Sequence, residues 1–72
     1  MIVTATVEKL RTGWRATVTA THVDGTDGVW VVRASRSVAV LHCMADALAR
    51  GWHADQVQWQ EIGAVEDHEE HP

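Results

Sequence analysis

The chain has 72 residues, enough for one small domain, and carries a formal charge of −4 from six basic and ten acidic side chains. Its single cysteine excludes an internal disulfide and fits a reducing cytoplasm, and no window approaches the roughly 18 apolar residues of a membrane helix. The start has no charged segment followed by an apolar run, so we expect no signal peptide and a cytoplasmic protein.

The first third of the chain predicts two antiparallel strands. Residues 2–9 alternate valine or alanine with threonine or glutamate, which is typical of a half-buried strand. A connection containing Gly13, a residue able to take a positive φ, predicts a hairpin. The second strand, over residues 14–21, repeats the alternation with apolar residues on one face and Arg15 and threonines on the other.

A turn and an apolar run follow. Residues 24–28 contain two Asp-Gly pairs, which is the strongest turn signal in the chain. Residues 29–33 are apolar on both faces, so this strand is either central in the sheet or covered by a partner. We favour the second interpretation, because a three-strand meander leaves its third strand at an edge.

From Ser35 the apolar period becomes that of a helix. Ser35 or Ser37 can cap the first turn, and Gly51 ends the helix after Arg50, whose charge suits the negative end of the helix dipole. Trp52 is expected to fold back on the last turn. The predicted buried stripe consists of Val38, Leu41, Met44, Ala45 and Leu48.

The last part predicts a closing strand and a tail. Residues 55–62 alternate again, whereas residues 64–72 form an acidic segment that we expect to be disordered. The fold class is therefore α+β, with the order β-β-β-α-β, a three-stranded antiparallel meander with one helix packed on it and a final strand, in a single domain over residues 1–63. The predicted core consists of Val3, Ala5, Val7, Trp14, Ala16, Val18, Val32, Val38, Leu41, Ala45, Leu48 and Val57.

No pattern in the chain supports catalysis, a metal or a cofactor. His68 and His71, among acidic residues of the tail, could ligate a transition metal, but a solvated tail is the more frequent role of such a segment. Cys43 and His42 are helix neighbours whose side chains point about 100° apart, so a nucleophile pair is not expected. We therefore expect a non-enzymatic protein that needs no cofactor.

The four tryptophans admit two interpretations. A stacking platform for single-stranded nucleic acid is one, and burial in a small core is the other. We favour the core for Trp14 and Trp52, and we weigh core and protein interface equally for Trp30 and Trp59.

The basic residues are few, because residues 1–65 hold six basic and six acidic side chains and are neutral in sum. Non-specific nucleic-acid binding requires a concentrated basic patch. A small nucleic-acid-binding regulator using Arg15, Arg33 and Arg36 is therefore an alternative function rather than the first expectation.

The order of the predicted elements, with short motifs along it, resembles the partial double-stranded-RNA-binding-type fold of HicB-family antitoxins, in particular their short actinobacterial members. The matching stretches are residues 4–7, 13–18, 32–36, 44–48 and 55–59. Residues 22–28 replace the proline-rich loop of that family, and no segment matches its DNA-binding domain, so operator binding is not implied.

The resemblance implies a non-catalytic module that inhibits an RNA-cleaving toxin, or another enzyme, by covering its surface. Val29, Trp30 and Val31 on an edge strand could anchor the partner, and Asp24 and Asp27 could meet a basic surface. A phage or mobile-element inhibitor of a host defence complex, of the anti-CRISPR kind, is an alternative with the same features. A homodimer is also expected, because oligomerisation stabilises small cores that lack disulfides and metals.

Overall fold

The computed structural model describes residues 1–63, which form one four-stranded mixed sheet and one helix. The strands are β1 (Ile2–Lys9), β2 (Trp14–His22), β3 (Gly25–Arg33) and β4 (Trp59–Ile62). Their order in the sheet is β3-β2-β1-β4; β1, β2 and β3 are antiparallel to their neighbours, and β4 runs parallel to β1. The predicted α+β class and the order β-β-β-α-β are confirmed.

Two hairpins connect the antiparallel strands, and each differs in detail from its prediction. Gly13 does not take a positive φ; instead, a Cβ on this residue would lie 2.5 Å from the carbonyl oxygen of Arg33. The glycine is thus required for a close approach between the first turn and the end of β3. The second turn is shorter than predicted, because β3 already begins at Gly25, where φ is +151°.

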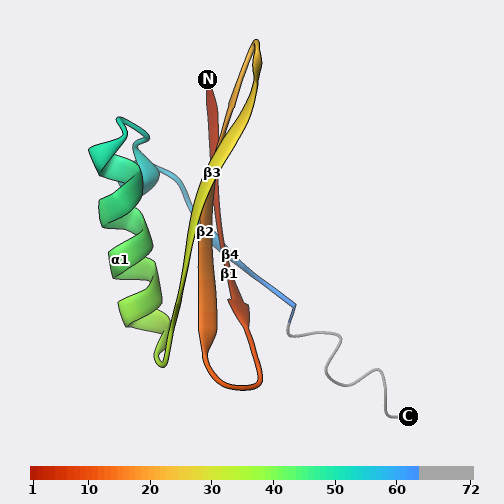
Figure 1. Cartoon of the computed structure of the whole chain (residues 1–72), viewed down its shortest axis with the longest axis vertical. Coiled ribbons are helices and arrows are strands. Elements are labelled where there is room, and N and C mark those ends of the chain that lie inside the picture. The colour runs from red at the N-terminus through yellow and green to blue at the C-terminus, as the bar shows by residue number, and fades with distance from the viewer. Residues whose placement is uncertain (64–72) are drawn as a thin grey trace.

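Helix α1 (Arg36–Ala49) packs on one side of the sheet, beside β2 and β3 (Figure 1). The hydroxyl of Ser35 accepts a hydrogen bond of 3.2 Å from the Val38 amide, so Ser35 is the N-cap. Gly51 takes a φ of +83° directly after the C-cap residue Arg50, which confirms the predicted helix stop.

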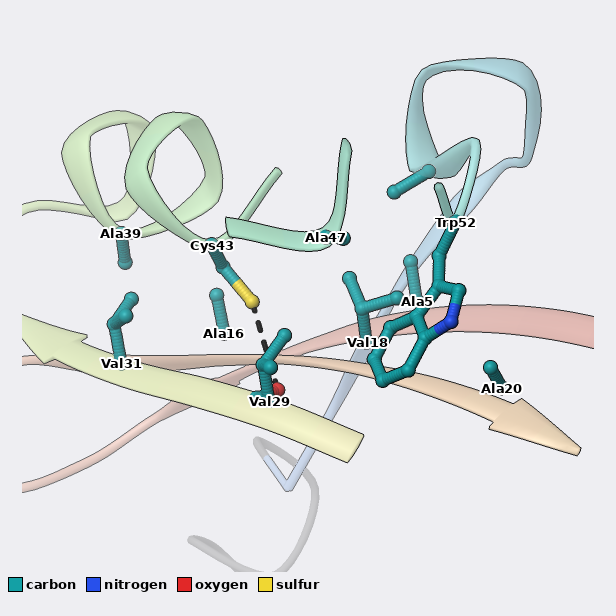
Figure 2. Close-up of a cluster of buried hydrophobic side chains, with 11 residues drawn as sticks. Ala5, Ala16, Val18, Ala20, Val29, Val31, Ala39, Cys43, Ala47 and Trp52 are labelled. Carbon is teal, nitrogen blue, oxygen red and sulfur yellow. Dashed lines mark hydrogen bonds between the residues drawn. The ribbon is translucent and has the colours of Figure 1, made fainter. Parts of the chain in front are cut away.

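The helix turns a different face to the sheet from the one predicted. Ala39, Cys43 and Ala47 have no exposed surface and lie over the strands (Figure 2), whereas Leu41 is 62% exposed. Four predicted core residues of the helix are therefore wrong: Val38, Leu41, Ala45 and Leu48 are exposed. The physical reason is that the sheet face is built of valine and alanine, and small helix residues let the two layers approach closely.

The sheet supplies the other half of the core from one face only. Its most deeply buried members are Ala5, Val7, Ala16, Val18 and Ala20. Val32 was predicted to be buried but is 38% exposed, because it alternates with Val31 and points to the opposite face. Trp14, Val3 and Val57 are partly buried against the core.

A short 3₁₀ turn, η1 (Ala54–Gln56), precedes β4, which is therefore four residues long and starts later than predicted. Trp52 is 8% exposed and reaches from the end of the helix onto the sheet (Figure 2), as expected. Trp59 is half-buried, and its indole Nε1 donates a 3.2 Å hydrogen bond to the Ala54 carbonyl. Trp59 thus packs against the core.

The predicted disorder of residues 64–72 and the candidate metal ligands His68 and His71 lie outside the described residues. Among residues 1–63, no helix has the length and apolar character that crossing a membrane requires.

Candidate protein-binding site

The sheet has a second face that, within residues 1–63, carries no helix (Figure 1). Because side chains alternate along strands, the residues between the buried ones share this face. Half of them are threonines, which hydrogen-bond water and tolerate solvent. We call this surface the open sheet face, and its members on the three long strands are Ile2, Thr4, Thr6, Glu8, Arg15, Thr17, Thr19, Thr21, Thr26, Gly28, Trp30 and Val32.

Trp30 is the large aromatic residue of the open sheet face. It is 64% exposed and lies opposite Thr17 in the β2–β3 register. Trp30, Thr17 and Arg15 line a shallow hollow of about 370 Å³. An indole beside a hydroxyl and a guanidinium offers apolar area together with hydrogen-bond donors, a combination that is enriched at protein interfaces. Thr17 was not named as a site residue, although its alternation in the second strand already predicted its outward position.

The edge of β3 lies next to this hollow. Within residues 1–63, β3 has a neighbouring strand on one side only, so alternate backbone amides and carbonyls point away from the sheet. The strand is nine residues long, whereas the opposite edge strand β4 has only four. A long edge strand is the more favourable template for the addition of another strand. The prediction that the third strand lies at an edge is confirmed.

Of the five predicted partner-binding residues, Trp30 is the one that belongs to the open sheet face. Val29 and Val31 are each 8% exposed and point toward α1. They cannot anchor a partner, because the helix already covers them. The apolar run was interpreted as one interface segment, but its alternate members serve opposite faces of the sheet, and Trp30 alone remains as an anchor.

Asp24 and Asp27 lie at the tip of the β2–β3 hairpin, which extends beyond the helix (Figure 1). They line a second shallow hollow of about 270 Å³ with His22 and the first two residues of β3. The Nε2 atom of His22 is 3.9 Å from a carboxylate oxygen of Asp27, whose side chain is 72% exposed. The two carboxylates are accessible, as predicted, and add negative charge to one end of the β3 edge.

The three arginines proposed as a nucleic-acid contact do not converge. Arg15 lies on the open sheet face, where its Nη1 is 3.2 Å from a glutamate carboxylate of β1. Arg33 donates from Nε to His42 Nδ1 at 3.1 Å on the helix side of the sheet. Arg36 is also on that side, with its Nε 3.3 Å from the Glu61 carboxylate. The charges of Arg15 and Arg36 are each partly neutralised, and the three do not form one basic patch.

Cys43 is buried at the helix–sheet contact, and its Sγ donates a 3.7 Å hydrogen bond to the Val29 carbonyl (Figure 2). Desolvation by burial, with a smaller contribution from the negative charge of Asp46, raises the pKa of the thiol from 9.0 to about 11. His42 next to it is engaged with Arg33 instead. A thiol in this environment is a small apolar core residue and not an activated nucleophile.

The raised pKa of Cys43 predicts a loss of stability in alkali. Folding favours the neutral thiol, so ionisation of Cys43 lowers the free energy of unfolding. The stability is unaffected below pH 9 and falls as the pH rises from 9.0 to about 11, by roughly 3 kcal/mol in total. The chain contains no tyrosine, so no phenol contributes in the same pH range. Urea unfolding between pH 8 and 11 measures this fall. A Cys43→Ala variant is expected to lose most of the slope, and an unchanged slope in that variant would contradict the assignment.

No cluster of three or more histidine, cysteine, aspartate or glutamate side chains suited to a metal ion occurs in residues 1–63. Comparison of the chain with family models, with curated proteins and with solved structures finds no match. The fold and this surface define a class of structure, a small four-stranded α+β domain with an open threonine-rich face and a long edge strand.

Proposed function

We propose that the chain is a non-catalytic protein-binding module that inhibits its partner, a toxin or another enzyme, in the manner of an antitoxin. The observation that carries the proposal is Trp30, which is 64% exposed beside the edge of β3. A partner strand added to β3 would make main-chain hydrogen bonds with its outward backbone groups. Trp30 would then supply an apolar anchor at the centre of the contact.

The chemistry around Trp30 suits a protein partner better than a nucleic acid. The charge of Arg15 beside Trp30 is partly neutralised by Glu8, whose carboxylate lies 3.2 Å from its Nη1, and the hairpin tip carries the negative side chains of Asp24 and Asp27. Negative charge favours a basic target, such as an enzyme that binds RNA, and opposes a phosphate backbone. The resemblance to HicB-family antitoxins points to the same kind of target. An inhibitor of a host defence complex remains an alternative that would use the same surface.

Capture of the partner by the tagged protein from host lysate, followed by titration with the purified partner, tests this proposal. Trp30→Ala is expected to weaken binding by at least roughly 30-fold, because truncating a central tryptophan costs about 2 kcal/mol or more. The same titration measures whether the partner's own activity falls as the complex forms.

Ile2→Ala is the matched control for Trp30→Ala. Ile2 is 65% exposed, on the same face, but on β1 rather than beside the β3 edge. Equal binding by wild type and Trp30→Ala would contradict the proposed site. Recovery of nucleic acid alone, insensitive to Trp30→Ala and lost in Arg15→Ala, would favour the regulator instead.

A further inference from the structure

Helix α1 is apolar on two opposite sides. One side packs on the sheet, and the other points away from it (Figure 1). At 100° per residue, the second side carries four residues that we call the outer helix face: Val38, Leu41, Ala45 and Leu48. Val38 is 39%, Leu41 62% and Leu48 40% exposed. A surface helix ordinarily carries polar residues on the side opposite its packed face, so a second apolar side indicates a second contact.

The spacing of the outer helix face is that of a helix–helix contact. Its members follow one another at intervals of three, four and three residues, which is the pattern of the apolar positions in a coiled coil. The charged residues of the helix, Arg36 and Asp46, do not interrupt it. This pattern therefore fits another helix better than an extended strand or a flat surface.

We propose that a second copy of this chain covers the outer helix face through an antiparallel helix pair. The four residues are placed symmetrically about position 43, at five and two residues on either side. A two-fold axis at that level sets Leu41 opposite Ala45 of the second copy, and Val38 opposite its Leu48. Each large side chain then meets a smaller one, and every apolar residue faces another, as a self-complementary interface requires.

Charge also favours a second copy. Because the outer helix face is uncharged, an identical face meets it without repulsion and with no buried charge. A basic or acidic partner would gain nothing there. The proposed target of the module is expected at the β3 edge, on a different part of the molecule, so the two contacts are compatible and independent.

The fully buried part of the core consists of small side chains, which gives the domain a reason to associate with a second copy. The largest fully buried side chains are only Val7, Val18 and Cys43. A domain of this size with so small a core is marginally stable, and association is one way to bury more apolar surface. The large apolar residues that remain exposed are Met1, Ile2, Val23, Trp30, Val32, Val38, Leu41, Leu48 and Ile62.

The size of the contact sets the expected strength. A helix of 14 residues is about 21 Å long, and one of its faces buries less than the roughly 800 Å² per partner of a standard interface. The dimer is therefore weak and depends on concentration. We expect half-dissociation at roughly micromolar protein.

Sedimentation equilibrium of the full chain, from sub-micromolar to several hundred micromolar, tests this proposal. Wild type is expected to pass from monomer to dimer over this range. Leu41→Glu is expected to stay monomeric throughout with an unchanged circular dichroism spectrum, because the side chain is 62% exposed and its replacement leaves the core intact. Ile2→Glu, on the open sheet face and 65% exposed, is the control and is expected to dimerise as wild type does.

Disulfide cross-linking tests the orientation without relying on the glutamate variant. A mixture of Leu41→Cys and Ala45→Cys proteins is expected to cross-link more efficiently than either alone, whereas the buried Cys43 of wild type is expected to give none. Cross-linking of Leu41→Cys chiefly with itself would overturn the antiparallel pairing. A monomeric wild type at every concentration, or a dimer lost in Ile2→Glu but kept in Leu41→Glu, would overturn the proposed face.

Discussion

Ala47→Leu is expected to destabilise the fold by about 3 kcal/mol, the upper part of the range for overpacking a tight core. Ala47 has no exposed surface and lies between the helix and the sheet. Three additional carbon atoms have no space there, because neighbouring positions on the strands are themselves alanine or valine and the layers are already in contact. A domain of this size has only a few kcal/mol of stability, so this one change is expected to unfold a large part of the population.

Urea unfolding followed by tryptophan fluorescence measures the effect of Ala47→Leu. Ala49→Leu is the matched control, since it makes the same substitution two residues later at an exposed position of the same helix. Leucine and alanine have similar helix propensities, so the control is expected to stay within about 0.5 kcal/mol of wild type. Equal stability of the two variants would mean that the helix does not turn its alanine side to the sheet.

The helix also shows where the sequence is informative and where it is not. Its end at Gly51 follows from local backbone chemistry and is as predicted, and of the two predicted caps, Ser35 and Ser37, Ser35 is the N-cap. The buried face does not follow, because the helix has two apolar stripes. Residue size favours the stripe with Leu41 and Leu48, but the shape of the opposing sheet selects the one with Ala39 and Ala47. Only the partner surface decides between two stripes, and that information is not local.

The candidate site divides in the same way. The edge position of β3 follows from the meander, and the exposure of Asp24 and Asp27 follows from the turn. The apolar run between Val29 and Val31 is ambiguous, because period-two alternation assigns faces only when the two faces differ in polarity. Once Val29 and Val31 are known to face the helix, Trp30 must lie on the opposite face of the sheet. Its cross-strand neighbour Thr17 then lies on that face too.

Placement of β4 depends on still longer-range information. The alternation over the last predicted strand does not indicate which strand it pairs with. In the structure β4, the last strand, pairs in parallel with β1, the first. Half of the predicted strand is used instead for η1 and the connection that seats Trp52 and Trp59 against the core. The two tryptophans contact the helix and the sheet together, so neither the local sequence pattern nor secondary-structure propensity predicts their placement.

Gly13→Ala is the second substitution with a large expected effect, a loss of about 2 kcal/mol. The backbone of Gly13 is one that alanine can adopt, since its φ is not positive, so a Cβ would ordinarily be neutral or stabilising. Here that atom would lie 2.5 Å from the carbonyl oxygen of Arg33, and also 3.3 Å from its carbonyl carbon. Both are backbone atoms, so either the turn or the end of β3 must move, at the cost of the pairing between Trp14 and Arg33.

Gly28→Ala is the control that isolates this steric cause. A Cβ at Gly28 would lie 3.4 Å from the Val18 carbonyl oxygen and 3.8 Å from the Thr19 hydroxyl, which are ordinary contacts. Removing a glycine from a strand lowers the entropy of the unfolded chain, so this variant is expected to gain about 0.5 kcal/mol. Urea midpoints of the two variants should therefore move in opposite directions from wild type. A rise of both midpoints would show that the approach of the first turn to β3 does not limit the fold, because the loss of unfolded-state entropy would then decide both results.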